Sequence, residues 1–172
     1  MKRRTWIGAG LALAAAGAGA GFAMWRRGND RGAVEAAFWQ MVLERPDGGS
    51  LAMARFHGRP LLLNFWATWC APCIKEMPLL DRFHREQKER GWQVLGLAID
   101  SAEPVREFLG KLPIGFPVVL GGLGGVELTR GLGNKDANLP FSVVFDRSGH
   151  VLDTRLGAVD AEKLEHWQRL LD

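Results

Sequence analysis

The chain has 172 residues, of which 47% are hydrophobic and 24% are charged, a composition that suits one globular domain and excludes a largely disordered or collagen-like protein. The formal charge of +3 is concentrated at the N-terminus, because residues 1–32 hold 6 of the 22 basic residues but only 1 of the 19 acidic ones. The remainder, with 16 basic and 18 acidic residues, has a charge of −2 and does not favour nucleic acid as a partner.

The beginning of the chain resembles a membrane-targeting segment. Three basic residues, Lys2 to Arg4, precede residues 5–25, a run without charge that could cross a hydrocarbon layer of about 30 Å as a helix. We expect this run to anchor the chain in the inner membrane, with the rest of the protein on the periplasmic or another extracytoplasmic side. A cleaved signal peptide is the alternative, because Ala18-Gly19-Ala20 offers a small-residue cleavage site.

The next two segments predict a tether and a hairpin. Residues 26–34 are charged and contain glycine, which suits a short tether between membrane and domain. The apolar runs Phe38 to Leu43 and Leu51 to Met53 flank the turn signal Pro46 to Gly49, which predicts a β-hairpin.

Two short apolar runs, Leu61 to Trp66 and Trp92 to Ile99, predict strands buried on both faces. Between them, the spacing of apolar residues predicts a helix over Pro72 to Arg90 that ends at Gly91. The first cysteine, Cys70, falls where the first of these strands ends and the helix begins. This is the edge of the sheet where open α/β folds place their sites.

The rest of the chain continues this alternation of strands and helices. The patterns predict a helix capped by Ser101 and running to Leu109, a strand over Phe116 to Leu120, a brief helix over Val126 to Leu132, a hairpin of Phe141 to Phe145 with Val151 to Leu156, and a final helix capped by Asp160. We therefore expect an α/β fold, with a central mixed sheet, helices on both of its faces and an added N-terminal hairpin. Residues 33–172 form this domain, and residues 1–32 form the signal or anchor segment with its tether.

The chain contains only two cysteines, Cys70 and Cys73. A disulfide that closes so short a loop stabilises a fold very little, so a purely structural role explains it poorly. A structural zinc site needs four ligands, and one CxxC motif supplies two of them. A redox pair is the remaining interpretation of this spacing.

The neighbours of the cysteines suit redox chemistry. A cysteine at a helix N-terminus is stabilised as a thiolate, which makes Cys70 the expected attacking thiol and Cys73 the resolving thiol. Pro72 fits the first turn of the helix because no hydrogen bond is lost there. Of the two nearby tryptophans, we expect Trp66 in the core and Trp69 exposed beside the thiol.

The stretch Asn64 to Pro78, NFWATWCAPCIKEMP, resembles the active site of the thioredoxin family. Within that family it is similar to the membrane-anchored TlpA/ResA/CcmG group of thiol-disulfide oxidoreductases, and the resemblance extends over about residues 38–172. It implies a thioredoxin-like fold and a CAPC redox centre. We expect no cofactor and no bound metal.

The resemblance also implies roles for individual residues. Glu76 matches an acidic residue that tunes the thiols in some members, although a solvated surface glutamate is the alternative. Pro140, after Leu139, matches the cis-proline that faces the disulfide and leaves a backbone edge for a substrate peptide, and Asn64 lies where thioredoxin has a buried aspartate. We therefore expect Trp69, Pro72, Leu139 and Pro140 to contact the substrate. The segment Asn138 to Ser142 departs from the family pattern Gly-x-Pro-Thr-Thr, so we expect the substrate groove to be altered.

The expected partners follow from the same resemblance. The substrate is a protein with a disulfide or a vicinal dithiol, such as apocytochrome c, and a membrane thiol reductase supplies the electrons. The chain is expected to act as a reductant and as a monomer, although the motif does not itself fix the direction of electron flow.

Two other functions remain open at this level. A peroxiredoxin-type peroxidase would need Pro and Thr seven and three residues before its cysteine, where this chain has Leu63 and Ala67. A copper-binding metallochaperone could use Cys70, Cys73 and His150 as soft ligands.

Overall fold

The computed structural model describes residues 31–171. Its central sheet has five strands in the order β5-β4-β3-β6-β7. Strands β3, β4 and β5 are parallel, whereas β6 is antiparallel to β3 and β7 is antiparallel to β6. The strands are β3 (Leu61–Trp66), β4 (Gln93–Ala98), β5 (Val118–Leu120), β6 (Phe141–Phe145) and β7 (Val151–Leu156). The predicted α/β fold with a mixed sheet is confirmed.

The two central strands were the clearest in the sequence and are confirmed almost to the residue. Every residue of β3 and of β4 is buried, as expected of parallel strands that are covered on both faces. The predicted hairpin of β6 and β7 also forms with its predicted bounds.

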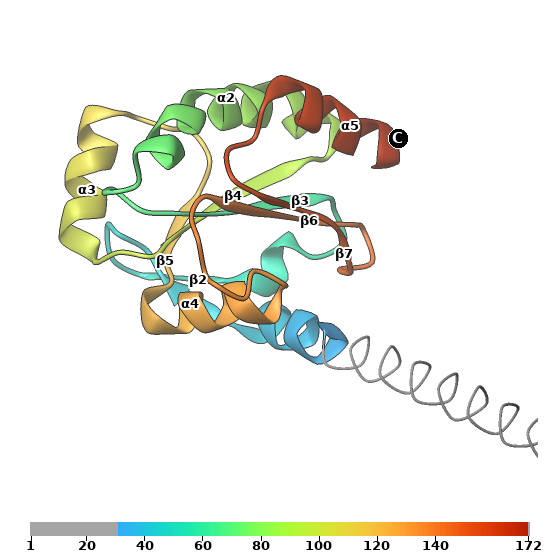
Figure 1. Cartoon of the computed structure of the whole chain (residues 1–172), viewed down its shortest axis with the longest axis horizontal. Coiled ribbons are helices and arrows are strands. Elements are labelled where there is room, and N and C mark those ends of the chain that lie inside the picture. The colour runs from blue at the N-terminus through green and yellow to red at the C-terminus, as the bar shows by residue number, and fades with distance from the viewer. Residues whose placement is uncertain (1–30, 172) are drawn as a thin grey trace, which may run out of the picture. The chain divides into compact units, whose positions relative to one another are not determined.

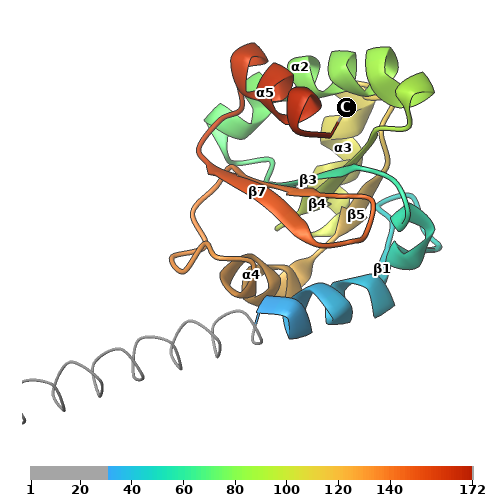
Figure 2. The same ribbon diagram turned by 90° about the vertical axis from the view of Figure 1, so that its right-hand side faces the viewer.

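Helices cover both faces of this sheet, as predicted. They are α2 (Ala71–Gln87), α3 (Ala102–Lys111), α4 (Gly122–Gly131) and α5 (Ala161–Leu171). Figures 1 and 2 show α2 and α5 lying over one face, and α4 together with the helix of residues 31–40 lying over the other. The helix bounds differ from the prediction by a few residues, most for α4, which begins at Gly122 and not at Val126.

The hydrophobic core therefore consists of two clusters, one on each face of the sheet. The α2-side cluster includes Leu62, Trp66, Cys70, Cys73, Met77, Leu80, Phe83, Val144, Val159, Leu164 and Trp167. The α4-side cluster includes Phe38, Met53, Leu61, Leu63, Phe65, Leu95, Leu97, Val143 and Phe145. Adjacent residues of β3 alternate between the clusters because successive side chains of a strand point to opposite faces.

The N-terminal part differs from its prediction. Residues 31–40 are helical, so the predicted tether is wrong over residues 31–34 and the predicted strand is wrong at Phe38. Phe38 is fully buried and its ring stacks on that of Phe145, with 5.1 Å between the ring centroids. Packing of this apolar face against the sheet explains why a helix forms here. The hairpin itself is present, but it is shorter and joins β1 (Val42–Glu44) to β2 (Ser50–Ala52).

Three predicted helix ends have different outcomes. Gly91 follows the 3₁₀ turn Lys88–Arg90 after α2 with a φ of 90°, a left-handed conformation that glycine adopts without steric cost. Asp160 caps α5, since its Oδ1 accepts a hydrogen bond from Lys163 N at 2.8 Å. Ser101 occupies the N-cap position of α3 but its side chain makes no capping bond, so that part of the prediction is wrong.

The predicted anchor, residues 5–25, lies outside the described residues. Within residues 31–171, no helix combines the length and the apolar character that crossing a membrane requires.

The importance of the α2-side cluster can be tested with Leu62→Ala. Leu62 is fully buried in β3, so we expect its truncation to lower the free energy of unfolding by about 2–5 kcal/mol in urea denaturation. Leu123→Ala is the matched control, because Leu123 is 88% exposed and its truncation should change that free energy by less than about 0.5 kcal/mol. Equal losses in the two variants would contradict this picture of the core.

Candidate active site

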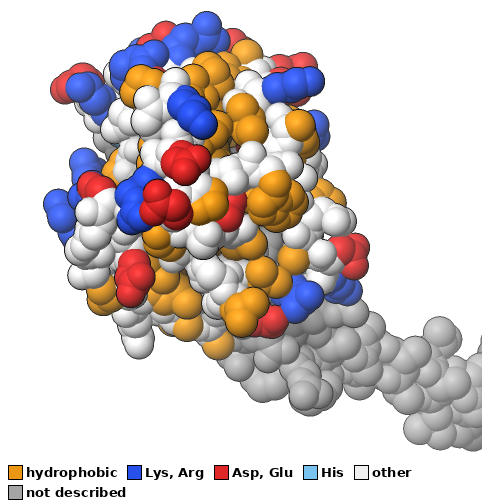
Figure 3. All heavy atoms as spheres, turned by 90° about the vertical axis from the view of Figure 1, so that its left-hand side faces the viewer, with side chains coloured by type: hydrophobic (Ala, Val, Ile, Leu, Met, Phe, Trp, Pro, Cys, Tyr) orange, Lys and Arg blue, Asp and Glu red, His pale blue; other side chains and the backbone are white. Residues whose placement is uncertain are grey.

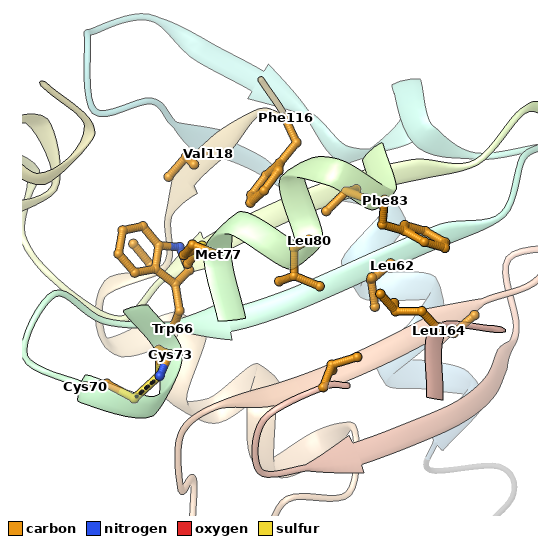
Figure 4. Close-up of a cluster of buried hydrophobic side chains, with 14 of the residues drawn as sticks. Leu62, Trp66, Cys70, Cys73, Met77, Leu80, Phe83, Phe116, Val118 and Leu164 are labelled. Carbon is orange, nitrogen blue, oxygen red and sulfur yellow. Dashed lines mark hydrogen bonds between the residues drawn. A yellow bond between two sulfur atoms is a disulfide. The ribbon is translucent and has the colours of Figure 1, made fainter. Parts of the chain in front are cut away.

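The two cysteines form a disulfide at the N-terminal end of α2. Cys70 is the N-cap residue of the helix, and its Sγ accepts a hydrogen bond from the backbone N–H of Cys73 at 3.3 Å (Figure 4). Cys73 lies one turn inside the helix, as predicted, and Pro72 lies in the first turn. Because unpaired N–H groups give a helix N-terminus partial positive charge, this position favours a thiolate on Cys70 once the disulfide is reduced.

The two sulfur-bearing residues differ in exposure. Cys70 is 6% exposed, whereas Cys73 is fully buried. A partner can therefore approach Cys70 more readily than Cys73. The two neighbouring tryptophans differ in the same way: Trp69 is 69% exposed and Trp66 is fully buried, as the sequence predicted.

Glu76 is buried beneath the first turns of α2 and is not a surface residue, so the surface alternative is wrong. It is only 3% exposed, and both of its carboxyl oxygens accept hydrogen bonds. Asn64 Nδ2 donates to Oε1 at 2.8 Å, and the backbone N–H of Val159 donates to Oε2 at 2.7 Å. These contacts join α2 to β3 and to the segment before α5.

Burial raises the pKa of the Glu76 carboxyl above its usual value, because it deprives the charged form of solvation. The hydrogen bonds from Val159 and Asn64 oppose this effect, since both stabilise the carboxylate. Glu76 is therefore a carboxyl group that can bind a proton more readily than an exposed glutamate. It lies three residues after Cys73 on the same face of α2, where it could exchange a proton with the thiol pair.

Asn64 is fully buried in β3, in the place where the resemblance to thioredoxin implies a buried polar residue. Its Nδ2 also donates to Ser142 Oγ at 3.0 Å, across the paired strands β3 and β6. Ser142 was not identified from the sequence. The feature of the sequence that could have identified it is a single hydroxyl residue within the otherwise apolar strand FSVVF.

A second pair of residues that the sequence analysis missed holds the loop before Cys70. Asp100 Oδ2 accepts hydrogen bonds from Thr68 N at 3.1 Å and from Thr68 Oγ1 at 2.6 Å, and Asp100 Oδ1 accepts one from Ser101 N at 2.8 Å. This carboxylate fixes the segment that presents Trp69 and Cys70. Asp100 follows β4, so its place at the carboxyl end of a parallel strand was the available signal.

The peptide bond between Leu139 and Pro140 is cis, as the resemblance implies. Leu139 is partly buried and packs against the α2-side cluster, to which both cysteines belong. Asn134 holds the preceding loop, because its Nδ2 donates to Asn138 O at 2.8 Å and its Oδ1 accepts from Asn138 N at 3.3 Å.

The copper site predicted as an alternative is not assembled. His150 lies beside the β6–β7 turn, where its Nδ1 is 3.0 Å from Glu35 Oε2 of the N-terminal helix. Among residues 31–171, no three His, Cys, Asp or Glu side chains come together as metal ligands. The set of Cys70, Cys73 and His150 is therefore wrong as a metal centre.

The disulfide does not line the pocket beside β5. A pocket of about 630 Å³ lies between the β1–β2 turn and the segment before β5, lined by residues that include Arg45, Arg106 and Phe116. Neither cysteine lines it. The exposed position of Trp69 beside Cys70 suits contact with another protein surface better than enclosure of a small molecule.

Comparison with known proteins agrees with this geometry. Residues 34–168 match the family model described as Redoxin. The thiol-disulfide oxidoreductase ResA of Bacillus thuringiensis subsp. konkukian is 32% identical over 122 residues, which cover 70% of this chain and 68% of that protein. The ResA of Halalkalibacterium halodurans is 28% identical over 137 residues, covering 76% and 72%.

A solved structure gives the same picture. The crystal structure described as a thiol:disulfide interchange protein DsbE of Chlorobium tepidum superposes with a TM-score of 0.66 at 28% identity, and covers 76% of this chain and 89% of that one. The similarity includes the fold on which the cysteine pair is presented.

The buried state of Glu76 predicts a pH effect on stability. Because its pKa is raised on folding, the folded state holds this proton more tightly than the unfolded chain. Its contribution to stability is therefore present below the unfolded pKa and is lost as pH rises towards the folded pKa. Glu76→Gln does not ionise, so its free energy of unfolding relative to the wild type should rise as the pH is raised above the usual pKa range of an exposed glutamate, measured in urea titrations.

Glu165→Gln is the control for this measurement, because the Glu165 side chain is 66% exposed on α5. Its stability relative to the wild type should stay nearly constant over the same pH range. A Glu76→Gln variant that follows the wild type in parallel at every pH would show that Glu76 does not titrate differently on folding.

Proposed function

The chain belongs to the Redoxin family as a thiol-disulfide oxidoreductase, and from this premise we propose that it reduces disulfides of proteins on the extracytoplasmic side of a membrane. The observation that carries this proposal is the asymmetry of the cysteine pair. Cys70 caps α2 and is slightly exposed, whereas Cys73 is fully buried one turn deeper.

The reaction proceeds by two thiol-disulfide exchanges. In the reduced protein, the Cys70 thiolate attacks one sulfur of the substrate disulfide, so that a mixed disulfide forms and the other substrate sulfur leaves as a thiolate. The Cys73 thiol then loses its proton and attacks Cys70 Sγ. The Cys70–Cys73 disulfide forms, and the substrate leaves as a dithiol that has gained two electrons from the cysteine pair and two protons from solvent.

We assign Glu76 as the group that accepts the proton of Cys73. It lies one helical turn beyond Cys73 on α2 and is buried. A carboxylate there can accept the proton when Cys73 attacks, and its raised pKa makes that transfer less unfavourable than transfer to an exposed glutamate.

The substrate in this proposal is a protein with an accessible disulfide, such as apocytochrome c. Trp69 and Pro72 are exposed next to Cys70 and offer apolar contacts. Leu139 is partly buried and Pro140 is buried, so in this proposal they contact the substrate through the backbone edge at the cis peptide bond. Helix α2 begins on the left in Figure 1, and Figure 3 shows that side, where hydrophobic side chains lie among charged groups. Such a mixed surface suits a transient protein complex.

The same proposal places residues 33–172 outside the cytoplasm as a monomeric redox domain, behind the leader of residues 1–32. It is supported by the uncharged run of residues 5–25, which follows Lys2, Arg3 and Arg4. A cysteine pair that has reduced its substrate is left as a disulfide, so a thiol reductase in the membrane must reduce it again before the next cycle. Residues 5–25 would hold the domain near that electron donor.

The cysteine roles are tested by Cys73→Ala and Cys70→Ala in the full chain, which each retain one thiol and therefore control for each other. Cys73→Ala should accumulate mixed disulfides with the natural substrate, because Cys70 can attack but nothing releases the product. Cys70→Ala should lose exchange activity and capture almost nothing, because Cys73 is buried. Non-reducing electrophoresis of envelope preparations, followed by mass spectrometry, identifies the captured proteins.

Two results would overturn the proposal. One is normal reduction of a model protein disulfide by both variants. The other concerns the redox state of the cysteines in the native envelope, measured by alkylation. A wild-type Cys70–Cys73 pair that is mostly oxidised, with substrate cysteines that are mostly reduced, would identify an oxidant and not a reductant.

A further inference from the structure

The buried polar group of Asn64, Glu76 and Ser142 contains an unmatched atom. Asn64 Nδ2 donates two hydrogen bonds, one to Glu76 Oε1 and one to Ser142 Oγ. Asn64 Oδ1, in the same amide, is buried and has no hydrogen-bond partner among the described residues. A buried polar atom without a partner is uncommon in folded proteins and calls for a physical explanation.

The surroundings of this group are apolar and uncharged. Asn64 shares its face of β3 with Leu62 and Trp66, and Ser142 shares its face of β6 with Val144. Leu62, Trp66 and Val144 belong to the α2-side cluster. The groups that face Glu76 from β3 and from the segment before α5 are the Asn64 amide and the backbone N–H of Val159.

The charged residues that follow or precede Glu76 on α2 point elsewhere. Lys75 is exposed, and Asp81 accepts a hydrogen bond from Gly115 N at 2.7 Å and forms an ion pair with Arg85. The protonation state of Glu76 is therefore governed by its burial and by uncharged hydrogen-bond partners. No neighbouring charge among the described residues fixes it.

The observed hydrogen bonds suit only the ionised form of Glu76. A carboxylate accepts from both the Asn64 and the Val159 N–H groups, which matches the observed contacts. A protonated carboxyl must instead donate its own O–H. The Val159 N–H cannot accept it, but Asn64 Oδ1 can if the amide turns and exchanges the positions of its oxygen and nitrogen.

We propose that Asn64 is a positioning residue whose side-chain amide turns by half a rotation to hold Glu76 both as a carboxylate and as a carboxylic acid, with the Ser142 hydroxyl following it. In the acid form, the Glu76 O–H and the Ser142 O–H both donate to Asn64 Oδ1. In the carboxylate form, Nδ2 donates to both partners. Glu76 gains or loses one proton between these forms, and no electrons move.

The identity of the residue at position 64 is what makes this possible. An amide has a donor and an acceptor of nearly equal size at equivalent positions, so that its rotation requires no extra space. A hydroxyl can likewise either donate or accept, which is why Ser142 can follow either form. This inference rests on the proposed function only for the source of the proton, which Cys73 is proposed to give to Glu76.

The rotation can be observed by NMR on the full chain in detergent micelles, in the disulfide form and without substrate. The Glu76 carboxyl carbon reports protonation, while nuclear Overhauser effects from the Asn64 Nδ2 protons to Glu76 report the orientation of the amide. We expect these effects at high pH and their loss as the carboxyl becomes protonated. Effects that stay unchanged while the carboxyl titrates, or a carboxyl that never titrates while the protein is folded, would overturn the proposal.

Gln93 provides an internal control in the same spectra. It is a buried amide in β4, but its Nε2 donates to Phe56 O at 2.7 Å and its Oε1 accepts from Arg59 at 2.7 Å. Since both of its polar atoms are paired, its contacts should not change over the same titration.

Substitution gives an independent measurement. Asn64→Leu should raise the affinity of Glu76 for its proton by about tenfold, because the bond lost by the carboxylate is stronger than the bond lost by the neutral acid. Gln93→Leu removes an equivalent buried amide and should leave that affinity unchanged. An equal change in both variants would indicate a general loss of structure and refute a specific role for Asn64. Neither measurement needs turnover, so normal reduction of a model protein disulfide by both cysteine variants would refute the proposed function alone.

Discussion

The use of a cysteine as the N-cap of α2 is the constraint on which the chemistry of this protein depends. A cap residue must lie where a strand ends and a helix begins, and its side chain must accept a hydrogen bond from the first helical turn. Cys70 meets both conditions because β3, which is buried between β4 and β6, delivers it to the edge of the sheet. The same geometry places Cys73 one turn deeper, within reach of the sulfur that it must attack. The slightly greater exposure of Cys70 than of Cys73 then follows from the direction of the helix.

Holding the cap in place requires polar groups in an otherwise apolar region. Asp100 fixes the loop before Cys70 through Thr68, and this carboxylate remains partly exposed. Glu76 lies on the inner side of α2, where loss of solvation favours its neutral form and its two uncharged partners, the Asn64 amide and the Val159 backbone N–H, compensate only in part. A group with such balanced preferences is poorly suited to stabilising a fold. Its burial and its place one turn beyond Cys73 on α2 are the properties on which its proposed role as a proton acceptor rests.

The N-terminal helix and hairpin complete the opposite face of the sheet. Phe38 stacks on Phe145, and Trp39 Nε1 donates to Gly149 O at 2.8 Å in the β6–β7 turn. Glu35 is buried beside the same turn and accepts from Val151 N at 3.1 Å. These contacts cover the α4-side cluster. The cysteines belong to the other cluster, so this addition to the sheet leaves the end of α2 open to partners.

Local patterns in the sequence determined the buried strands, the β6–β7 hairpin and the position of the cysteine pair at a helix start. Each depends on the spacing of apolar residues that are close together in the sequence, because this spacing matches the repeat of a strand or of a helix. Tertiary structure alone decided that Glu76 is buried, since its partner Val159 lies 83 residues away, and that His150 contacts Glu35, 115 residues away, and not the cysteines. It also converted the segment around Phe38 from a predicted strand into a helix. In each case the deciding contact joins elements far apart in the chain, and propensity carries no record of such contacts.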